Sequence, residues 1–188
     1  SEMCIRDSCL GKLRQWQAVL GESRLEIVHA GESCRLGSAQ SFSLLVGYSS
    51  ADYLMLADQD DVWLPTKISC SIAAVCQAEH GGGHPTSQIV VPCLICTDVF
   101  VVDEYLEPIS ESYWTYQSIY PSRFPWLGRF LVENTVQGCT TIFNRALADL
   151  IRPVPSACPY ADWWIALVAV TFGRIVPLPS QTLLWLSL

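Results

Sequence analysis

The fold is decided by the stretch Tyr53-Leu54-Met55-Leu56-Ala57-Asp58-Gln59-Asp60-Asp61-Val62-Trp63. It is an apolar run that stops on three carboxylates, and a short run of this kind is typical of a buried strand. The carboxylates would then lie at the carboxyl end of the strand, where open α/β sheets bind their ligands. Acids this close repel one another, so we expect a divalent cation, bound by their oxygens, to offset the repulsion. A solvated acidic turn that caps the next helix is the simpler alternative.

Length and composition narrow the class of protein. The chain has 188 residues, which indicates one domain with a sizeable core. Apolar residues make up 51% of it and charged residues 15%, which excludes a disordered chain. The formal net charge is −7 and no cluster of Lys and Arg is present, which argues against a nucleic-acid-binding surface.

The nine cysteines are scattered and odd in number. The close pair Cys93 and Cys96 lies in an apolar run, where positions three apart point to opposite faces of a strand, so it suits neither zinc nor redox chemistry. His29, His80 and His84 lack ligand spacing relative to this pair. We therefore expect reduced, structural cysteines and a cytoplasmic location. No stretch reaches the roughly 18 apolar residues of a membrane span.

Hydrophobic periodicity predicts alternating helices and strands. Helices are expected over residues 10–21, 38–48, 65–79, 124–131, 144–151 and 161–168, and strands over 25–28, 52–57, 88–96, 139–143, 174–178 and 182–185. Such alternation indicates an α/β sheet of mostly parallel strands. Residues 1–9 resemble a translated adapter sequence, and we expect them to be an unstructured or artefactual leader in front of a domain over 10–188.

Acids recur at the ends of the predicted elements. Asp98 follows the strand over 88–96, and Asp162 opens the helix over 161–168, directly before Trp163 and Trp164. A place in the first helical turn would explain Asp162 without any function. If the sheet has one switch point, the fold class predicts that it collects Asp58, Asp60, Asp61, Asp98 and Asp162.

Five blocks of the sequence, in order, resemble the family 2 glycosyltransferases, in particular their rhamnosyltransferase-like branch. The blocks are residues 57–68, Thr97-Asp98 with 101–104, 137–140, 162–168 and 172–176. The first contains the family's D-x-D segment, here Asp58-Gln59-Asp60-Asp61, and the likeness covers residues 25–185. Any one block would be a weak signal, whereas five in the family's order are a specific one.

The resemblance implies a GT-A-type (Rossmann-like) fold with a mostly parallel central sheet flanked by helices. It implies an inverting glycosyltransferase that uses Mn²⁺ or Mg²⁺ and a nucleotide-diphosphate sugar donor. The sugar would be rhamnose or a similar deoxyhexose, and the acceptor a saccharide or lipid-linked saccharide, a precursor of a cell-surface polysaccharide or glycolipid. The expected place is the cytoplasmic face of the inner membrane, by peripheral association without a transmembrane segment.

The same resemblance assigns roles to the acids and their neighbours. Asp60 would bind the metal ion, and Asp162 would be the catalytic base. The donor-binding residues would be Asp58, Asp61, Asp98, Gly138 and Cys139. Trp163 and Trp164 would shape the acceptor pocket, and because neighbouring helix positions face different ways, we expect one in the core and the other in the pocket. A carboxylate against indoles is partly desolvated, which raises its pKa toward that of a useful base.

The chain departs from the family pattern at both ends. The family's first strand and acidic loop, which hold the nucleotide base, have no counterpart, and Leu184-Trp185-Leu186-Ser187-Leu188 stands where the family has an Arg-Gln-His-like segment. We therefore expect a partial catalytic domain, truncated at both ends and without its first strand–helix unit, that binds donor poorly. The alternatives are an inactive fragment or a non-catalytic module that binds a divalent cation or a nucleotide sugar. A sugar-nucleotide pyrophosphorylase would need a Gly-rich N-terminal loop with Arg and Lys, which the sequence lacks.

Overall fold

The structure, a computed structural model, describes residues 2–28, 36–79, 90–121 and 126–187, with side chains from residue 10 onward. His29, His80 and His84 lie outside the described residues. The chain divides into two compact units, Ser1–Leu36 and Gly37–Leu188, and this division differs from the single domain expected from residue 10 onward.

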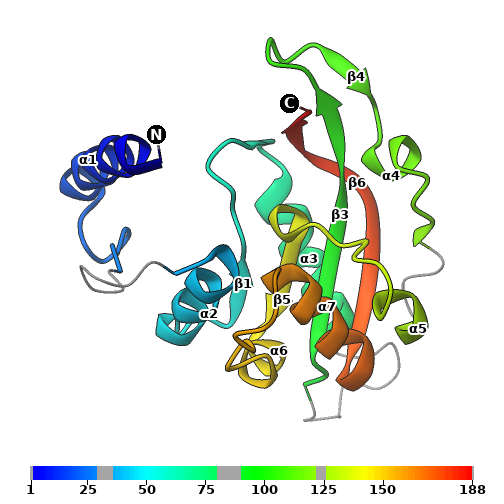
Figure 1. The fold of residues 1–188 in the computed structure, drawn as a ribbon. Coiled ribbons are helices and arrows are strands. Elements are labelled where there is room, and N and C mark those ends of the chain that lie inside the picture. Colours follow the sequence, from blue (N-terminus) through cyan, green and yellow to red (C-terminus); the bar gives the residue numbers. More distant parts are fainter. Residues whose placement is uncertain (1, 29–35, 80–89, 122–125, 188) are drawn as a thin grey trace. The chain divides into compact units, whose positions relative to one another are not determined.

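The first unit consists of helix α1 (Glu2–Leu20) and the segment after it (Figure 1). The helix ends as predicted, with Gly21 in the left-handed region at φ 84°. It begins at Glu2, so an unstructured leader is the wrong description of residues 2–9, where no proline interrupts the helix. Trp16, expected in a core, is 59% exposed.

No strand forms over residues 25–28, contrary to the prediction. The backbone groups of Leu25 bond locally: its N–H donates to the Gly21 carbonyl at 3.1 Å, and its carbonyl accepts from Gln17 Nε2 at 2.9 Å. Alternation creates a strand only where a partner strand completes its hydrogen bonds.

The second unit is built on a six-stranded mixed sheet with the strand order β1-β5-β3-β6-β2, and β4 pairs with β3 outside this path. The strands are β1 (Tyr53–Met55), β2 (Val62–Trp63), β3 (Cys93–Val102), β4 (Pro108–Ser110), β5 (Thr141–Asn144) and β6 (Arg174–Leu186). β3 and β6 are parallel, while the other recorded pairs are antiparallel. The α/β class is confirmed, but a mostly parallel sheet is wrong, because β5 runs against both β1 and β3 and β4 folds back on β3 after a short turn.

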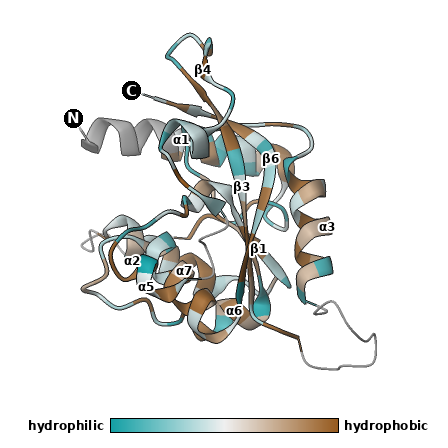
Figure 2. Ribbon diagram, turned by 90° about the vertical axis from the view of Figure 1, so that its right-hand side faces the viewer, coloured by the Kyte–Doolittle hydropathy of each residue, from teal (hydrophilic) through white to brown (hydrophobic). Residues whose placement is uncertain are grey.

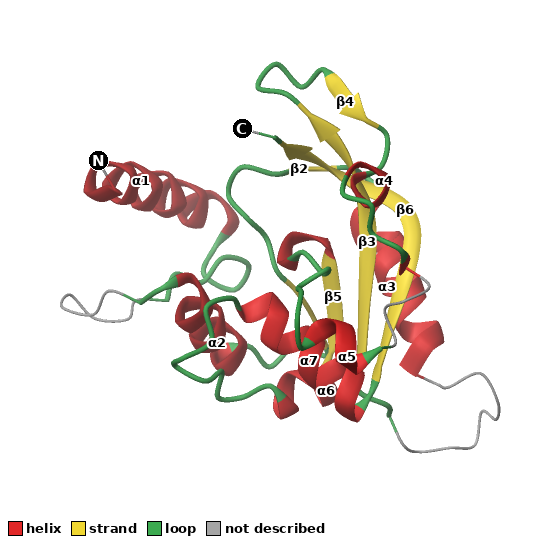
Figure 3. Ribbon diagram, turned by 45° about the vertical axis from the view of Figure 1, so that its right-hand side comes forward, coloured by secondary structure: helices red, strands yellow, loops and turns green. Residues whose placement is uncertain are grey.

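The spine of the sheet is the β3–β6 pair, two long strands lying side by side (Figure 3). Two separate strands over 174–178 and 182–185 were predicted, and this is wrong, since β6 is one strand that continues past Pro179. Its register jumps from Thr97↔Leu178 to Asp98↔Gln181, so the residues around Pro179 bulge out and the ladder continues. β3 likewise runs through Asp98 and does not end at Cys96.

Helices cover both faces of the sheet (Figure 2). Helix α3 (Lys67–Glu79) lies on one face, and α2 (Ser38–Tyr48), α6 (Arg145–Leu150) and α7 (Ala161–Phe172) lie on the other. Alternate residues of β3 serve the two layers: Cys93 and Ile95 pack with Val75 of α3, whereas Leu94 and Cys96 belong to the larger cluster with α7.

The remaining elements are short: α4 (Tyr113–Tyr116), α5 (Leu127–Phe130) and the 3₁₀ turn η2 (Gly138–Thr140) before β5. As predicted, Asn144 starts the next helix, its Oδ1 accepting the Leu147 N–H at 3.1 Å. None of the helices in the described part of the chain is long and apolar enough to cross a membrane.

Candidate functional site

The acidic loop, residues 56–61, leads from β1 to β2, the two outermost strands of the ordered sheet. The loop therefore runs from one edge of the sheet to the other, past β5, β3 and β6. The predicted position of the acids after the β1 strand is confirmed. Asp58 and Asp60 are exposed, whereas Asp61 is half-buried.

Within the described residues, one group of side chains could hold a metal ion: Asp58, Asp61 and Cys139, whose ligand atoms all lie within 4.8 Å of one another. Oδ2 of Asp61 is buried and accepts no hydrogen bond from the described part of the chain. Asp60, the predicted metal ligand, does not belong to this group. The structure thus brings two of the three loop acids together with a cysteine from η2.

The electrostatics of the group follow from burial. Partial loss of hydration raises the pKa of both Asp58 and Asp61, and the charge of Asp60 adds to the shift of each. Burial, and then the neighbouring Asp61 carboxylate, raise the pKa of the Cys139 thiol, so this thiol stays protonated at neutral pH. Without a cation, the group therefore presents the carboxylate oxygens of Asp58 and Asp61 beside a protonated thiol.

Asp162 lies in the first turn of α7, and two backbone amides hold its carboxylate. Gly138 N–H donates to its Oδ2 at 3.1 Å, and Trp163 N–H donates to its Oδ1 at 2.7 Å. Burial nevertheless raises the pKa of Asp162, because loss of hydration outweighs these two hydrogen bonds, and the charge of Asp58 acts in the same direction.

Asp58 and Asp162, far apart in the sequence, face one small cavity of about 190 Å³. Its other lining residues are Ser38, Phe42, Leu56, Gly138, Tyr160 and Ala161. Of the predicted convergence, the structure thus shows Asp58 together with Asp61 in one group, and Asp58 together with Asp162 at one cavity.

Asp98 is not part of this group. It is buried in the middle of β3, and its carboxylate accepts three hydrogen bonds: from Val99 N–H at 2.9 Å, Ser112 Oγ at 2.6 Å and Trp114 N–H at 3.2 Å. These contacts fasten the start of α4 to the sheet. A carboxylate so fully engaged has a structural task at this position.

Both tryptophans of α7 are anchored by their indole N–H groups. Trp163 donates to the carbonyl of Phe130, and Trp164 donates to the carbonyl of Ile151 at 2.9 Å. Neither lines the cavity between Asp58 and Asp162. Instead of one core and one pocket position, both indoles tie α7 to neighbouring segments.

Lys67 received no role from its sequence pattern, yet it is fully buried. Its Nζ donates to the Cys139 carbonyl at 2.8 Å and lies 4.8 Å from the centre of the Trp63 ring. The four-residue spacing of one face of α3 is the feature that could have indicated its burial. The buried residues on this face are Lys67, Ser71, Val75 and Glu79. The apolar residues of this helix instead suggest a buried face that includes Ile68, but Ile68 is 56% exposed.

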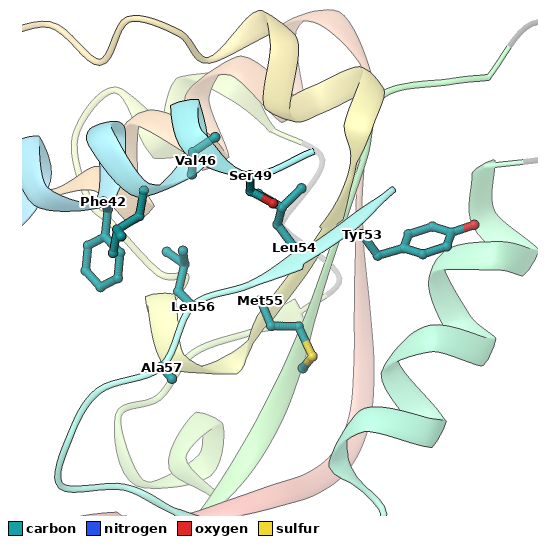
Figure 4. A pocket seen from close by; sticks show the side chains of 9 residues that line it. Phe42, Val46, Ser49, Tyr53, Leu54, Met55, Leu56 and Ala57 are labelled. Carbon is teal, nitrogen blue, oxygen red and sulfur yellow. The ribbon is translucent and has the colours of Figure 1, made fainter. Parts of the chain in front are cut away.

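A second cavity, of about 420 Å³, lies between α2 and β1. In Figure 4, Phe42 and Val46 of α2 stand over Leu54 and Leu56 of the β1 segment. Its lining is apolar apart from Ser49 and Tyr53, and no carboxylate reaches it. It offers neither a cation ligand nor a general base.

No protein-family model and no curated protein matches the chain. The candidate function therefore rests on the side chains themselves. These are the exposed carboxylate of Asp58 and the half-buried carboxylate of Asp61 beside a buried thiol, and a third carboxylate, held by two amides, at the cavity that Asp58 also lines.

Proposed function

We propose that the chain carries the donor and base residues of a metal-dependent, inverting glycosyltransferase with a GT-A-type fold. The observation that supports this most is the shared cavity, which has Asp58 of the acidic loop and Asp162 of α7 in its lining. Sugar transfer from a nucleotide diphosphate needs these two functions close together: charge neutralisation at the leaving group and a base at the attacking hydroxyl.

The chemistry of the acidic loop fits a hard divalent cation. Mn²⁺ and Mg²⁺ prefer carboxylate oxygens, and Asp61 has a buried oxygen that accepts no hydrogen bond from the described residues. Asp58 and Asp61 would hold the ion, whereas Asp60 lies outside this group. Bound there, the ion would neutralise the charge that develops on the departing diphosphate.

Asp162 would act as the general base. It would take the proton of the acceptor hydroxyl as that oxygen attacks the anomeric carbon and the bond to the diphosphate breaks. Its raised pKa makes it a better proton acceptor than an exposed aspartate, and the Gly138 and Trp163 amides fix its orientation. A single displacement of this kind inverts the anomeric centre.

The cavity of about 190 Å³ is smaller than the roughly 300–1,000 Å³ of typical ligand pockets. Only part of a nucleotide sugar would lie in it, and we assign that part to the transferred sugar. Rhamnose is the sugar, and a cell-surface polysaccharide or glycolipid precursor the acceptor, that the sequence resemblance favours.

Calorimetry with Mn²⁺ and a panel of nucleoside diphosphates tests the proposal. We expect weak but metal-dependent nucleotide binding, which Asp61→Ala and Asp58→Ala abolish. Asp60→Ala separates two assignments: the resemblance places the ion on Asp60, whereas the geometry favours Asp58 and Asp61. Asp52→Ala is the matched control, because it removes one exposed carboxylate next to β1 but outside the loop.

Two outcomes would contradict the proposal. One is nucleotide binding that does not depend on the metal or that survives Asp58→Ala and Asp61→Ala. The other is full sugar transfer by Asp162→Asn, measured as release of the nucleoside diphosphate in the presence of acceptor. Metal-dependent binding without any transfer would instead support the non-catalytic binding module.

A further inference from the structure

Lys67 is a buried, charged residue that has no role in the proposed metal site or as the proposed base. It opens α3, directly after the loop and β2, and none of its side chain is exposed. An unpaired buried ammonium is costly, so each of its three protons must find a partner. The partners are the Cys139 carbonyl at 2.8 Å, Thr182 Oγ1 at 3.5 Å and the face of the Trp63 ring.

These contacts set the direction of a longer buried chain of hydrogen bonds. An ammonium donates only, so Thr182 Oγ1 accepts from Lys67 and its own proton points elsewhere. The oxygen of Thr97 lies 2.6 Å away and receives that proton, while Thr97 in turn donates to the Thr140 carbonyl at 3.3 Å. Lys67 therefore holds two successive carbonyls of η2, Cys139 directly and Thr140 through two threonines.

The other side of η2 faces the cavity. Its first residue, Gly138, donates its amide to Asp162 Oδ2 at 3.1 Å. The turn has only three residues, Gly138–Thr140, so holding the Cys139 and Thr140 carbonyls also restrains the Gly138 amide. The charge of Lys67 also acts on Asp61, whose pKa it lowers against the effect of burial.

We propose that Lys67 is a positioning residue: through the Cys139 carbonyl and the two threonines it fixes η2, and η2 aims the Asp162 carboxylate into the cavity. Its importance for sugar transfer rests on the proposed function, but its effect on η2 does not. The two can therefore fail separately.

Nuclear magnetic resonance of the full, ligand-free chain tests this directly. The sequence has two lysines, the buried Lys67 and the exposed Lys12, so labelling with ¹⁵N-lysine gives one ammonium signal to test and one internal control. We expect the Lys67 ammonium protons to exchange with water at least about tenfold more slowly than those of Lys12. Equal exchange rates would overturn the proposal without any variant.

The second readout is the amide resonance of Gly138. In Lys67→Met, which keeps the length of the side chain but loses its donors, we expect this resonance to shift upfield and its hydrogen exchange to accelerate about tenfold, with the amides in the middle of α7 unchanged. Asp162→Asn should cause a shift of the same sign, and adding Lys67→Met to it should change little more. A Gly138 resonance at its wild-type position in folded Lys67→Met would overturn the proposal.

Two further variants keep the test decisive if Lys67→Met does not fold. Lys67→Gln retains a donor without the charge, and Thr182→Val removes the arm through the threonines while leaving the Cys139 carbonyl bonded. In each variant, the Gly138 resonance should move less than halfway toward its position in Asp162→Asn. If it moves in neither variant, the proposal is wrong. The Gly138 resonance could stay at its wild-type position in all Lys67 and Thr182 variants while the chain still binds nucleotide in a metal-dependent way. This result would refute the role of Lys67 but not the proposed function.

Discussion

The amide nitrogen of Gly138 lies 3.1 Å from Oδ2 of Asp162, and this hydrogen bond joins the turn before β5 to the first turn of α7. The bond directly connects two residues that line the cavity of about 190 Å³. A side chain at position 138 would point at the same carboxylate, because a Cβ there would lie 3.5 Å from Asp162 Cβ and 3.5 Å from Leu56 Cδ1.

Gly138→Ala should therefore separate folding from binding. Contacts at 3.5 Å are ordinary van der Waals contacts, so we expect the free energy of unfolding to change by less than about 1 kcal/mol. The new methyl group takes space in a cavity of about 190 Å³, so the affinity for a nucleotide sugar should fall about tenfold, whereas that for the nucleoside diphosphate should change little. Denaturation and calorimetry measure the two effects. Equal losses for both ligands would place the sugar elsewhere.

Asp98→Ala should unfold more easily without changing metal binding. It removes the acceptor of three hydrogen bonds, from the Ser112 hydroxyl and from the Val99 and Trp114 N–H groups, and we expect a loss of about 2–4 kcal/mol in the free energy of unfolding. Urea denaturation gives this value, and calorimetry on the folded variant gives the affinity for Mn²⁺. Loss of Mn²⁺ affinity at full stability would return Asp98 to the donor site.

Gly173→Ala should be among the most damaging single substitutions. A Cβ at this position would lie 2.0 Å from the Pro92 carbonyl oxygen, and the next residue donates to the same carbonyl at 3.0 Å. Because backbone must move, we expect a loss of about 3 kcal/mol or more. Gly47→Ala in α2 is the control: nothing lies within 4 Å, so the helix should gain about 0.5–1 kcal/mol. Similar unfolding midpoints for both variants would contradict this packing.

Stability should fall as the pH rises through the titration of Asp58, Asp61 and Asp162, which are partly shielded from water. Burial raises the pKa of Asp58, Asp61 and Asp162 above 3.8, so the folded chain binds protons that the unfolded chain has already lost. The free energy of unfolding should then decrease from pH 3.8 up to the raised pKa values and level off above them. Urea denaturation at stepped pH measures this slope. In Asp162→Asn the slope should be smaller, and an unchanged slope would mean that Asp162 does not contribute.

The local parts of this fold could be predicted from the sequence. The strand before Asp58, the helix after Gly37, the cap at Asn144 and the helix of Asp162 each depend on residues a few positions apart, and all four are found. The meeting of Asp58 with Asp162 was predictable only as a consequence of the fold class.

What the sequence could not decide depends on partners far away in the chain. The segment over residues 25–28 alternates like a strand but has no described partner, and β6 continues past Pro179 because its ladder to β3 absorbs the bulge. Asp98 reads as a strand end, yet pairing with β6 carries β3 beyond it. Lys67 was missed because lysines are rarely buried, and its partners come from η2 and β6.

The pairing of β2 with β6, Val62 with Leu184 and Trp63 with Leu183, has a consequence for biosynthesis. The strand that fixes the end of the acidic loop lies far downstream of residues 58–61, so it leaves the ribosome after them. Closing so long a stretch of chain is slow compared with forming a local helix. We therefore expect cation affinity to appear only once β6 has paired with β2, so that Mn²⁺ binding would report the formation of this pair.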